Sequence, residues 1–133
     1  MNRLLLLLLS LSLLATACKK DPSAPDPSLE GRWNSRSTTG YSYDAAGQLL
    51  SQDSVADVSY YMVITPDSLN YYDITNGSSW GRHKYTRQGN ALQYSRAKCT
   101  ITRLSEHTLS LRFQNIDRVP NMPYSEWEDN YSR

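Results

Sequence analysis

From Leu29 onward, apolar and polar residues alternate with a period of two, and no stretch keeps a helical period over three turns. Val58, Tyr60, Met62 and Ile64 show the pattern, because all four fall on one face of an extended segment. Successive side chains of a β-strand point to opposite faces, so this alternation is typical of half-buried strands. The sequence therefore predicts a chain built of strands.

Turn signals separate the alternating segments. Pro66 and Asp67 follow the segment that ends at Ile64, and Asn76-Gly77 is a dipeptide typical of hairpins. The segments predicted as strands are 32–43, 49–55, 58–64, 69–74, 80–87, 91–95, 99–104, 108–115 and 124–131.

Eight or nine short strands without a long crossover predict an all-β fold, and they favour a small antiparallel up-and-down barrel or a sandwich over any parallel sheet. The length of 133 residues allows one small domain. Tyrosine is frequent, with 10 residues, and two explanations stay open. Either the barrel interior is partly open at one end, or tyrosine covers both faces of the sheet because of its high strand propensity.

The N-terminal segment has a different composition. After Arg3, the twelve residues from Leu4 to Ala15 are almost all leucine. Twelve helical residues reach only ~18 Å, which is too short for the ~30 Å hydrocarbon core of a bilayer. The segment is therefore predicted to be the apolar part of a signal peptide.

Ala15-Thr16-Ala17-Cys18 resembles the lipobox of bacterial lipoproteins, although Ala15 stands where leucine is commonest. The resemblance implies that residues 1–17 are a signal peptide and that Cys18 carries a diacylglyceryl anchor, which with two or three acyl chains is effectively permanent. The alternative is an ordinary secretory signal cut near Ala17, with Cys18 left as a free thiol. Because Lys19 and not aspartate follows the cysteine, the expected location is the outer membrane, in either leaflet.

Residues 18–28 are predicted to form a flexible tether. Three of the six prolines lie between Lys19 and Ser28, and no large apolar residue accompanies them. Such a segment buries too little surface to fold. The folded domain is expected at 29–133. Without residues 1–17 the chain has 13 basic and 13 acidic residues, so it lacks the basic excess that nucleic-acid binding needs.

Two motifs carry a family likeness. Leu29-Glu30-Gly31-Arg32-Trp33 resembles the opening Gly-x-Trp of lipocalin-type barrels. Residues 81–85 and 89–92 are similar to the central hairpin of bacterial lipocalin-like lipoprotein domains, and 41–47, 65–67 and 101–104 resemble those domains in order and spacing. The resemblance covers roughly 29–113, which is most of the chain after the predicted signal peptide, and it implies a small lipocalin-like β-barrel on a lipid anchor, although further segments typical of true lipocalins are not found.

The same resemblance implies a structural role for Trp33. In lipocalin-type barrels this tryptophan closes one end of the barrel and stacks on a basic side chain near the C-terminus. The candidate partners here are Arg133 and Arg118. A cation–π contact of this kind contributes ~0.5–2 kcal/mol.

No recognisable catalytic or metal-binding motif is present in the sequence. His83 and His107 are expected to be exposed, and a metal site formed by them with Asp73 would rest on composition alone. Cys99 is predicted to be a buried small hydrophobe. The chain is therefore predicted not to be an enzyme and to need no cofactor or metal.

Glu126 and Glu128 lie on one face of the last predicted strand. We expect this face to be a solvated edge that discourages pairing between sheets.

Two functions from different classes are compatible with a monomeric barrel. The first is binding of a small, mostly apolar ligand, with Tyr60, Met62, Tyr71 and Leu92 as candidate lining residues. Eight strands leave just enough interior for one small ligand or for packed side chains alone. The resemblance alone favours this function slightly.

The second function is that of an accessory lipoprotein or inhibitor whose packed barrel contacts another envelope protein. An exposed aromatic patch, for instance of Tyr61, Tyr72 and Trp80, would favour it.

Overall fold

The computed structural model describes residues 27–94, 97–115 and 118–133. The predicted signal peptide and Cys18 lie outside the described residues, as does all but the end of the predicted tether. Within the described ranges, β-strands are the only regular secondary structure. Their bounds are β1 (Gly31–Tyr43), β2 (Leu49–Ala56), β3 (Tyr60–Ile64), β4 (Ser68–Asp73), β5 (Ser79–Lys84), β6 (Thr86–Gln88), β7 (Ala91–Tyr94), β8 (Ala97–Leu104), β9 (Thr108–Asn115) and β10 (Tyr124–Ser132).

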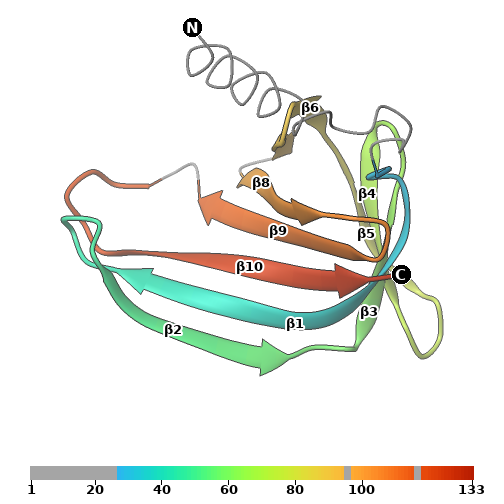
Figure 1. The fold of residues 1–133 in the computed structure, drawn as a ribbon, viewed down its shortest axis with the longest axis horizontal. Helices are drawn as coiled ribbons and strands as arrows, with labels where there is room; N and C mark the ends of the chain where they lie inside the picture. Colours follow the sequence, from blue (N-terminus) through green and yellow to red (C-terminus); the bar gives the residue numbers. More distant parts are fainter. Residues whose placement is uncertain (1–26, 95–96, 116–117) are drawn as a thin grey trace, which may run out of the picture.

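All ten strands belong to one antiparallel sheet in the order β5-β4-β3-β1-β10-β9-β8-β7-β6, with β2 also paired to β1 (Figure 1). Strands β3 and β2 pair with β1 one after the other, at residues 31–34 and 37–43. If β2–β3 and β5–β6 are each counted as one bent strand, the sheet is an eight-stranded meander. Pairing between its first strand, β1, and its last strand, β10, closes the meander into a barrel. The predicted small antiparallel up-and-down barrel is confirmed. No helix in the described part of the chain is long and apolar enough to cross a membrane.

The predicted strand over 80–87 is divided at Tyr85 into β5 and β6. The Tyr85 N–H donates to the carbonyl of Asp67 at 3.0 Å, and the Tyr85 hydroxyl donates to the carbonyl of Thr65 at 2.8 Å. Both bonds fix the bend against the turn between β3 and β4. As a result β5 pairs with β4, whereas β6 pairs with β7.

Inward-facing side chains from seven of the ten strands fill one end of the barrel. Cys99 is among them with no exposed surface, as predicted, and burial raises the pKa of its thiol to about 12. The core consists of Leu29, Trp33, Tyr60, Met62, Ile64, Leu69, Leu92, Cys99, Ile101, Leu109, Leu111, Phe113 and Tyr131.

Arg133 and Trp33 close this end of the barrel. The Arg133 guanidinium lies 4.0 Å from the centroid of the fully buried Trp33 ring. It also donates to the carbonyls of Ser28 (2.9 Å), Glu30 (2.9 Å) and Glu106 (2.6 Å). One side chain thus joins the start of β1, the turn between β8 and β9, and the tryptophan.

The geometry at this end of the barrel explains why the Gly-x-Trp motif has a glycine at position 31. Gly31 has a φ of +119°, and a Cβ there would lie 3.3 Å from the Arg133 guanidinium. The other candidate partner of Trp33, Arg118, instead lies 3.5 Å from the centroid of Tyr124.

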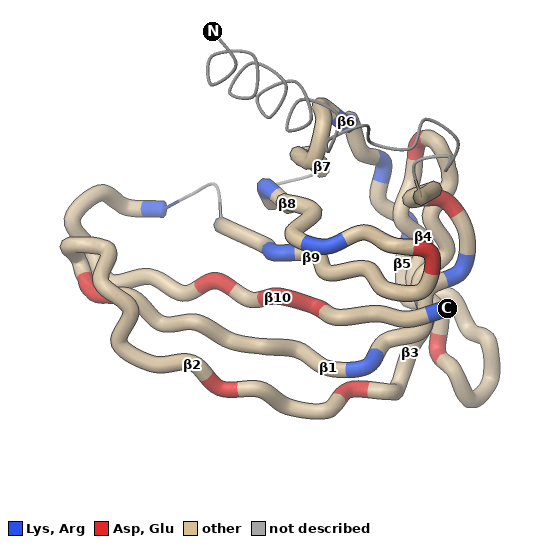
Figure 2. The backbone as a smooth tube through the Cα atoms, in the orientation of Figure 1, with Lys and Arg blue, Asp and Glu red and all other residues tan. Residues whose placement is uncertain are grey.

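Strands β1, β2 and β10 reach past the opposite end of the barrel as an extension (Figure 1). All eight residues of β2 are exposed, and within the described residues β2 pairs only with β1. Acidic positions lie along β2 and β10 (Figure 2).

The expectation of a solvated edge at Glu126 and Glu128 is wrong. Strand β10 lies between β1 and β9, so it is an inner strand of the sheet. Glu126 is only 9% exposed and accepts hydrogen bonds from Arg112 Nε at 2.7 Å and from Gln114 Nε2 at 2.9 Å. Its carboxylate therefore links neighbouring strands.

Candidate functional site at the open end of the barrel

The strand register defines which side chains face inward at the open end. Asp129 lies opposite Thr38 on β1 and opposite Leu111 on β9, and Leu111 is fully buried in the core. Directly opposed residues in an antiparallel pair share a face of the sheet. Asp129 therefore faces inward, together with Trp127 and Tyr131 two positions away on the same strand.

A continuous series of rings follows this inner face. Neighbouring ring centroids are 5.3–6.2 Å apart, which is the range of favourable aromatic contacts. We call this series the aromatic belt; it consists of Tyr60, Tyr71, Trp80, His83, Tyr94, Phe113, Trp127 and Tyr131.

Part of the aromatic belt is open to solvent. Trp80 is 54% exposed and Trp127 is 39% exposed. His83 is also exposed, although it lies opposite Leu69, which is fully buried. In a barrel filled to this level these inward-facing rings would be buried. The described inner wall is therefore unfilled at the open end.

The four predicted lining residues divide into two levels. Tyr60 and Tyr71 belong to the aromatic belt. Met62 and Leu92 have no exposed surface and lie in the packed core. Of the two tyrosines, Tyr71 is partly exposed, whereas Tyr60 is only 7% exposed and also belongs to the packed core.

Sequence reasoning missed Trp80 as an inward-facing residue. The register shifts so that Gly81 lies opposite Tyr71 while Ser79 lies opposite Tyr72, which leaves Trp80 as the extra residue of a β-bulge. Its ring consequently packs 5.5 Å from Tyr60. Simple alternation does not reveal such a bulge.

The exposed patch expected from Tyr61, Tyr72 and Trp80 therefore does not form as one cluster. The Tyr61 and Tyr72 rings stack 5.1 Å apart, and the Arg32 guanidinium covers Tyr61 at 3.8 Å. These two tyrosines face the opposite side of β3 and β4 from Tyr60 and Tyr71.

Hydrogen bonds fix the carboxylate of Asp129 within the site. The Thr38 hydroxyl donates to one oxygen at 2.7 Å, and the Tyr131 hydroxyl lies 3.5 Å from the other. The Tyr131 and Tyr60 hydroxyls are 3.1 Å apart and share a hydrogen bond. Burial raises the pKa of Asp129, and the bonds from Thr38 and Tyr131 oppose this shift.

The charge of Asp129 influences the surrounding phenols. Burial raises the pKa of Tyr60 to about 12, and the negative charge of Asp129 adds to this effect. The pKa of Tyr131 is raised well above its ordinary value for the same two reasons, with Tyr71 and Tyr60 contributing. The phenols are thus fixed as neutral hydrogen-bonding groups at ordinary pH.

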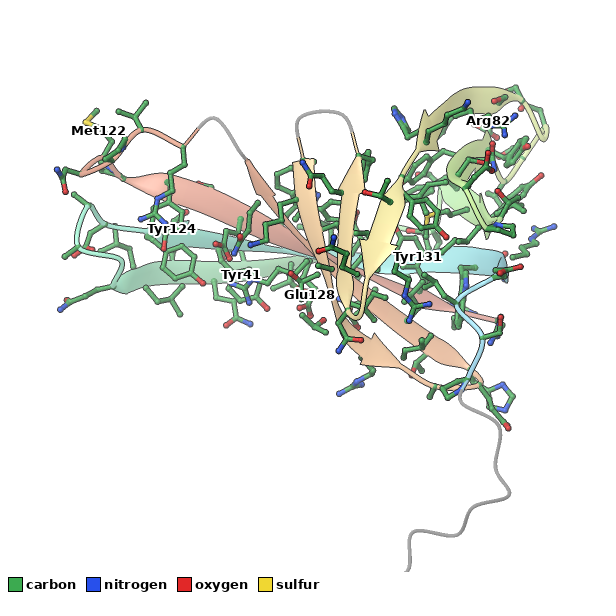
Figure 3. All side chains as sticks on the ribbon, turned by 90° about the horizontal axis from the view of Figure 1, so that it is seen from above. Tyr41, Arg82, Met122, Tyr124, Glu128 and Tyr131 are labelled. Carbon is green, nitrogen blue, oxygen red and sulfur yellow. The ribbon has the colours of Figure 1, made fainter. Side chains whose placement is uncertain are left out.

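A groove of about 620 Å³ continues from Trp127 to the tip of the extension. The exposed side chains of Val119 and Met122 line it together with Arg118 and Tyr124. Figure 3 shows Met122 and Tyr124 toward the tip, far from Tyr131 at the barrel. Trp127 belongs both to this groove and to the aromatic belt, so the two surfaces are continuous.

The two histidines do not form a metal site with Asp73. His83 lies in the belt, whereas His107 is an exposed residue of the turn between β8 and β9. Residues 27–94, 97–115 and 118–133 contain no group of three or more histidine, cysteine, aspartate or glutamate side chains placed to hold a metal ion.

Comparison of the chain with protein-family models, with curated proteins and with solved structures found no match.

Proposed function

We propose that the chain is a lipid-anchored, lipocalin-like protein of the outer membrane that binds a small, mostly apolar ligand at the open end of its barrel. The observation that carries this proposal is the exposure of inward-facing rings, above all Trp80 and Trp127. A barrel that served only as a solid body would gain stability by covering these rings. Leaving them exposed is consistent with a surface that a ligand covers.

The composition of the inner face fits small-molecule recognition. Ligand sites are mostly apolar and aromatic, with a few placed polar groups that orient the ligand. Here the belt provides the rings, and Asp129, Thr38 and the Tyr60–Tyr131 hydroxyl pair provide the polar groups. The polar groups hold one another in position before any ligand arrives.

Binding is tested with N-phenyl-1-naphthylamine, a neutral apolar dye whose fluorescence rises in an apolar site. We expect saturable fluorescence with the purified full chain, and at least about threefold weaker binding in Trp127→Ala, because loss of buried aromatic surface weakens binding. Tyr72→Ala, which removes a ring from the outer face, is the matched control and is expected to bind normally. Absence of saturable binding by the unsubstituted chain would refute the proposal.

The lipid anchor is tested separately. The sequence around Cys18 supports acylation, so metabolic labelling with radioactive palmitate is expected to mark the protein. Cys18→Ala is the control that should abolish the label. Equal labelling of both chains would contradict anchoring at this residue.

One observation favours the second candidate function, that of an accessory lipoprotein. The eight residues of β2 are all exposed, and Leu50 and Val55 are apolar. A free strand edge can pair with a strand of another protein. A photo-crosslinking side chain at Gln52 would capture such a partner in cells, and recovery of no partner above background would count against this function.

A further inference from the structure

We propose that the open end of the barrel is selective for an organic cation, a primary or quaternary ammonium group with an apolar body. The ammonium group would lie beside Asp129 and Asp53, and the apolar body would lie against Trp127. The inference rests on the proposed function and specifies the ligand class of the same site.

Gly40 leaves an open slot beside Trp127. It lies opposite Trp127 on β10 and opposite Asp53 on β2, so all three share the inner face. A Cβ at position 40 would have one heavy atom within 4 Å, the carbonyl oxygen of Asp53 at 4.0 Å. The Trp127 ring stacks on Phe113 at 5.3 Å instead of covering the glycine.

The inner face around this slot carries negative charge only. Asp53 and Asp129 are its two charged residues at the inward positions of β1, β2 and β10, and the remaining positions are neutral. The guanidinium groups of the nearby Arg112 and Arg118 cover Tyr41 and Tyr124, whose positions lie on the opposite face of β1 and β10, and Arg118 also lines the groove that begins at Trp127. Figure 2 shows the acidic positions of β2 and β10 in this part of the molecule. The local field therefore attracts cations.

A cation fits this face better than a neutral or anionic ligand does. The side chain of Asp129 is partly buried, and no basic side chain in the described part of the chain forms an ion pair with it. A carboxylate that has hydrogen bonds but no basic partner in such surroundings raises the free energy of the folded protein, and an incoming ammonium group would supply the missing charge. The face of an indole ring such as Trp127 also attracts cations.

The charge preference is tested with three probes that share a phenyl ring and a short chain. These are 2-phenylethylammonium, neutral 2-phenylethanol and anionic 3-phenylpropanoate, titrated calorimetrically into the purified full chain at pH 7 and low salt. We expect the ammonium to bind about tenfold more tightly than the alcohol, a difference equivalent to about 1.4 kcal/mol. The carboxylate is expected to bind most weakly.

Two substitutions locate the effect. Asp129→Asn is expected to make the ammonium and the alcohol bind about equally. Glu128→Gln is the matched control, because it removes the same charge from the adjacent residue on the opposite face of β10, and it should leave the preference intact. Gly40→Val fills the slot at a position where extended backbone suits a β-branched residue, so it should weaken binding of all three probes without lowering the melting temperature.

The outcomes separate this inference from the proposed function. Equal binding of the ammonium and the alcohol, or an ammonium preference that persists in Asp129→Asn, would overturn the charge selectivity and leave the apolar ligand site standing. If neither the three probes nor the neutral naphthylamine dye binds, both proposals fail.

Discussion

At the scale of single residues, Arg133 has the clearest structural consequence. Its guanidinium covers Trp33 and donates to three backbone carbonyls from separate segments. Arg133→Ala should therefore lower the free energy of unfolding by about 2 kcal/mol, since it removes a cation–π contact and several charge-assisted hydrogen bonds. Chemical denaturation measures the change.

Arg133→Lys is the control for this prediction. A lysine keeps the charge over the ring, but it lacks the planar fork that reaches several carbonyls, so it should restore only part of the stability. Unchanged stability in Arg133→Ala would contradict the role of this residue in closing the barrel.

Asp129 makes stability depend on pH in a definite direction. Burial raises its pKa above the ordinary value of 3.8, so the folded protein binds this proton more tightly than the unfolded chain does. Ionised Asp129 therefore lowers the stability of the fold. This loss is absent when the pH is below the ordinary pKa, and it is complete when the pH is above the raised pKa of the folded state. Asp129→Asn removes this loss, because its side chain is neutral at every pH.

Thermal unfolding across pH therefore checks the role of Asp129. At pH 7 Asp129→Asn should melt at a higher temperature than the unsubstituted protein, and the difference should shrink as the pH falls through the folded-state pKa. A residue that destabilises the fold while binding a ligand is a common compromise at functional sites. A variant that is less stable at pH 7, or a difference that does not vary with pH, would contradict this account.

At the scale of elements, Glu126 connects β10 to β9. It is nearly buried and accepts hydrogen bonds from Arg112 and Gln114 on the neighbouring strand. Glu126→Ala removes the carboxylate partner of the Arg112 guanidinium, which stays partly buried. We therefore expect the free energy of unfolding to fall by about 3 kcal/mol. Denaturant unfolding measures this loss.

Glu128→Ala serves as the comparison on the same strand, because Glu128 is more exposed and accepts one hydrogen bond from Thr102. Its effect should stay below about 1 kcal/mol, as for other exposed polar contacts. Equal losses in both variants would show that the buried pair has no special role.

The strands themselves could be predicted because their signals are local. Alternation and turn residues placed nearly every strand within a few residues, including β9 at 108–115. Two features depended on distant parts of the chain and could not be predicted. The bend at Tyr85 depends on bonds to Thr65 and Asp67, and the inner position of β10 depends on its pairing with β1 and β9.

The candidate site was predicted only in part for the same reason. Tyr60 and Tyr71 were found because alternation places them inward. Trp80 turns inward through a bulge, and Asp129 joins Thr38 only when β10 pairs with β1. Sequence spacing contains neither of these arrangements.

At the scale of the whole molecule, the barrel and its extension should differ in local stability. The residues of β2 are all exposed, whereas β9 contributes Leu109, Leu111 and Phe113 to the core. Amide hydrogens of β2 should therefore exchange at least about tenfold faster than those of β9, since local opening is easiest where few apolar contacts are lost. Hydrogen exchange followed by mass spectrometry gives both rates, and equal protection would indicate that another molecule covers the β2 edge.

The three tryptophans of the chain give a direct test of whether a ligand binds at the open end of the barrel. Trp33 is fully buried at the closed end, where its indole N–H donates to the Leu29 carbonyl at 2.8 Å, whereas Trp80 and Trp127 lie in the aromatic belt. In a ¹H–¹⁵N NMR titration with 2-phenylethylammonium, the indole signals of Trp80 and Trp127 should shift while that of Trp33 stays in place. A shift confined to Trp33, or no shift of any indole signal at saturating probe, would contradict binding at the open end.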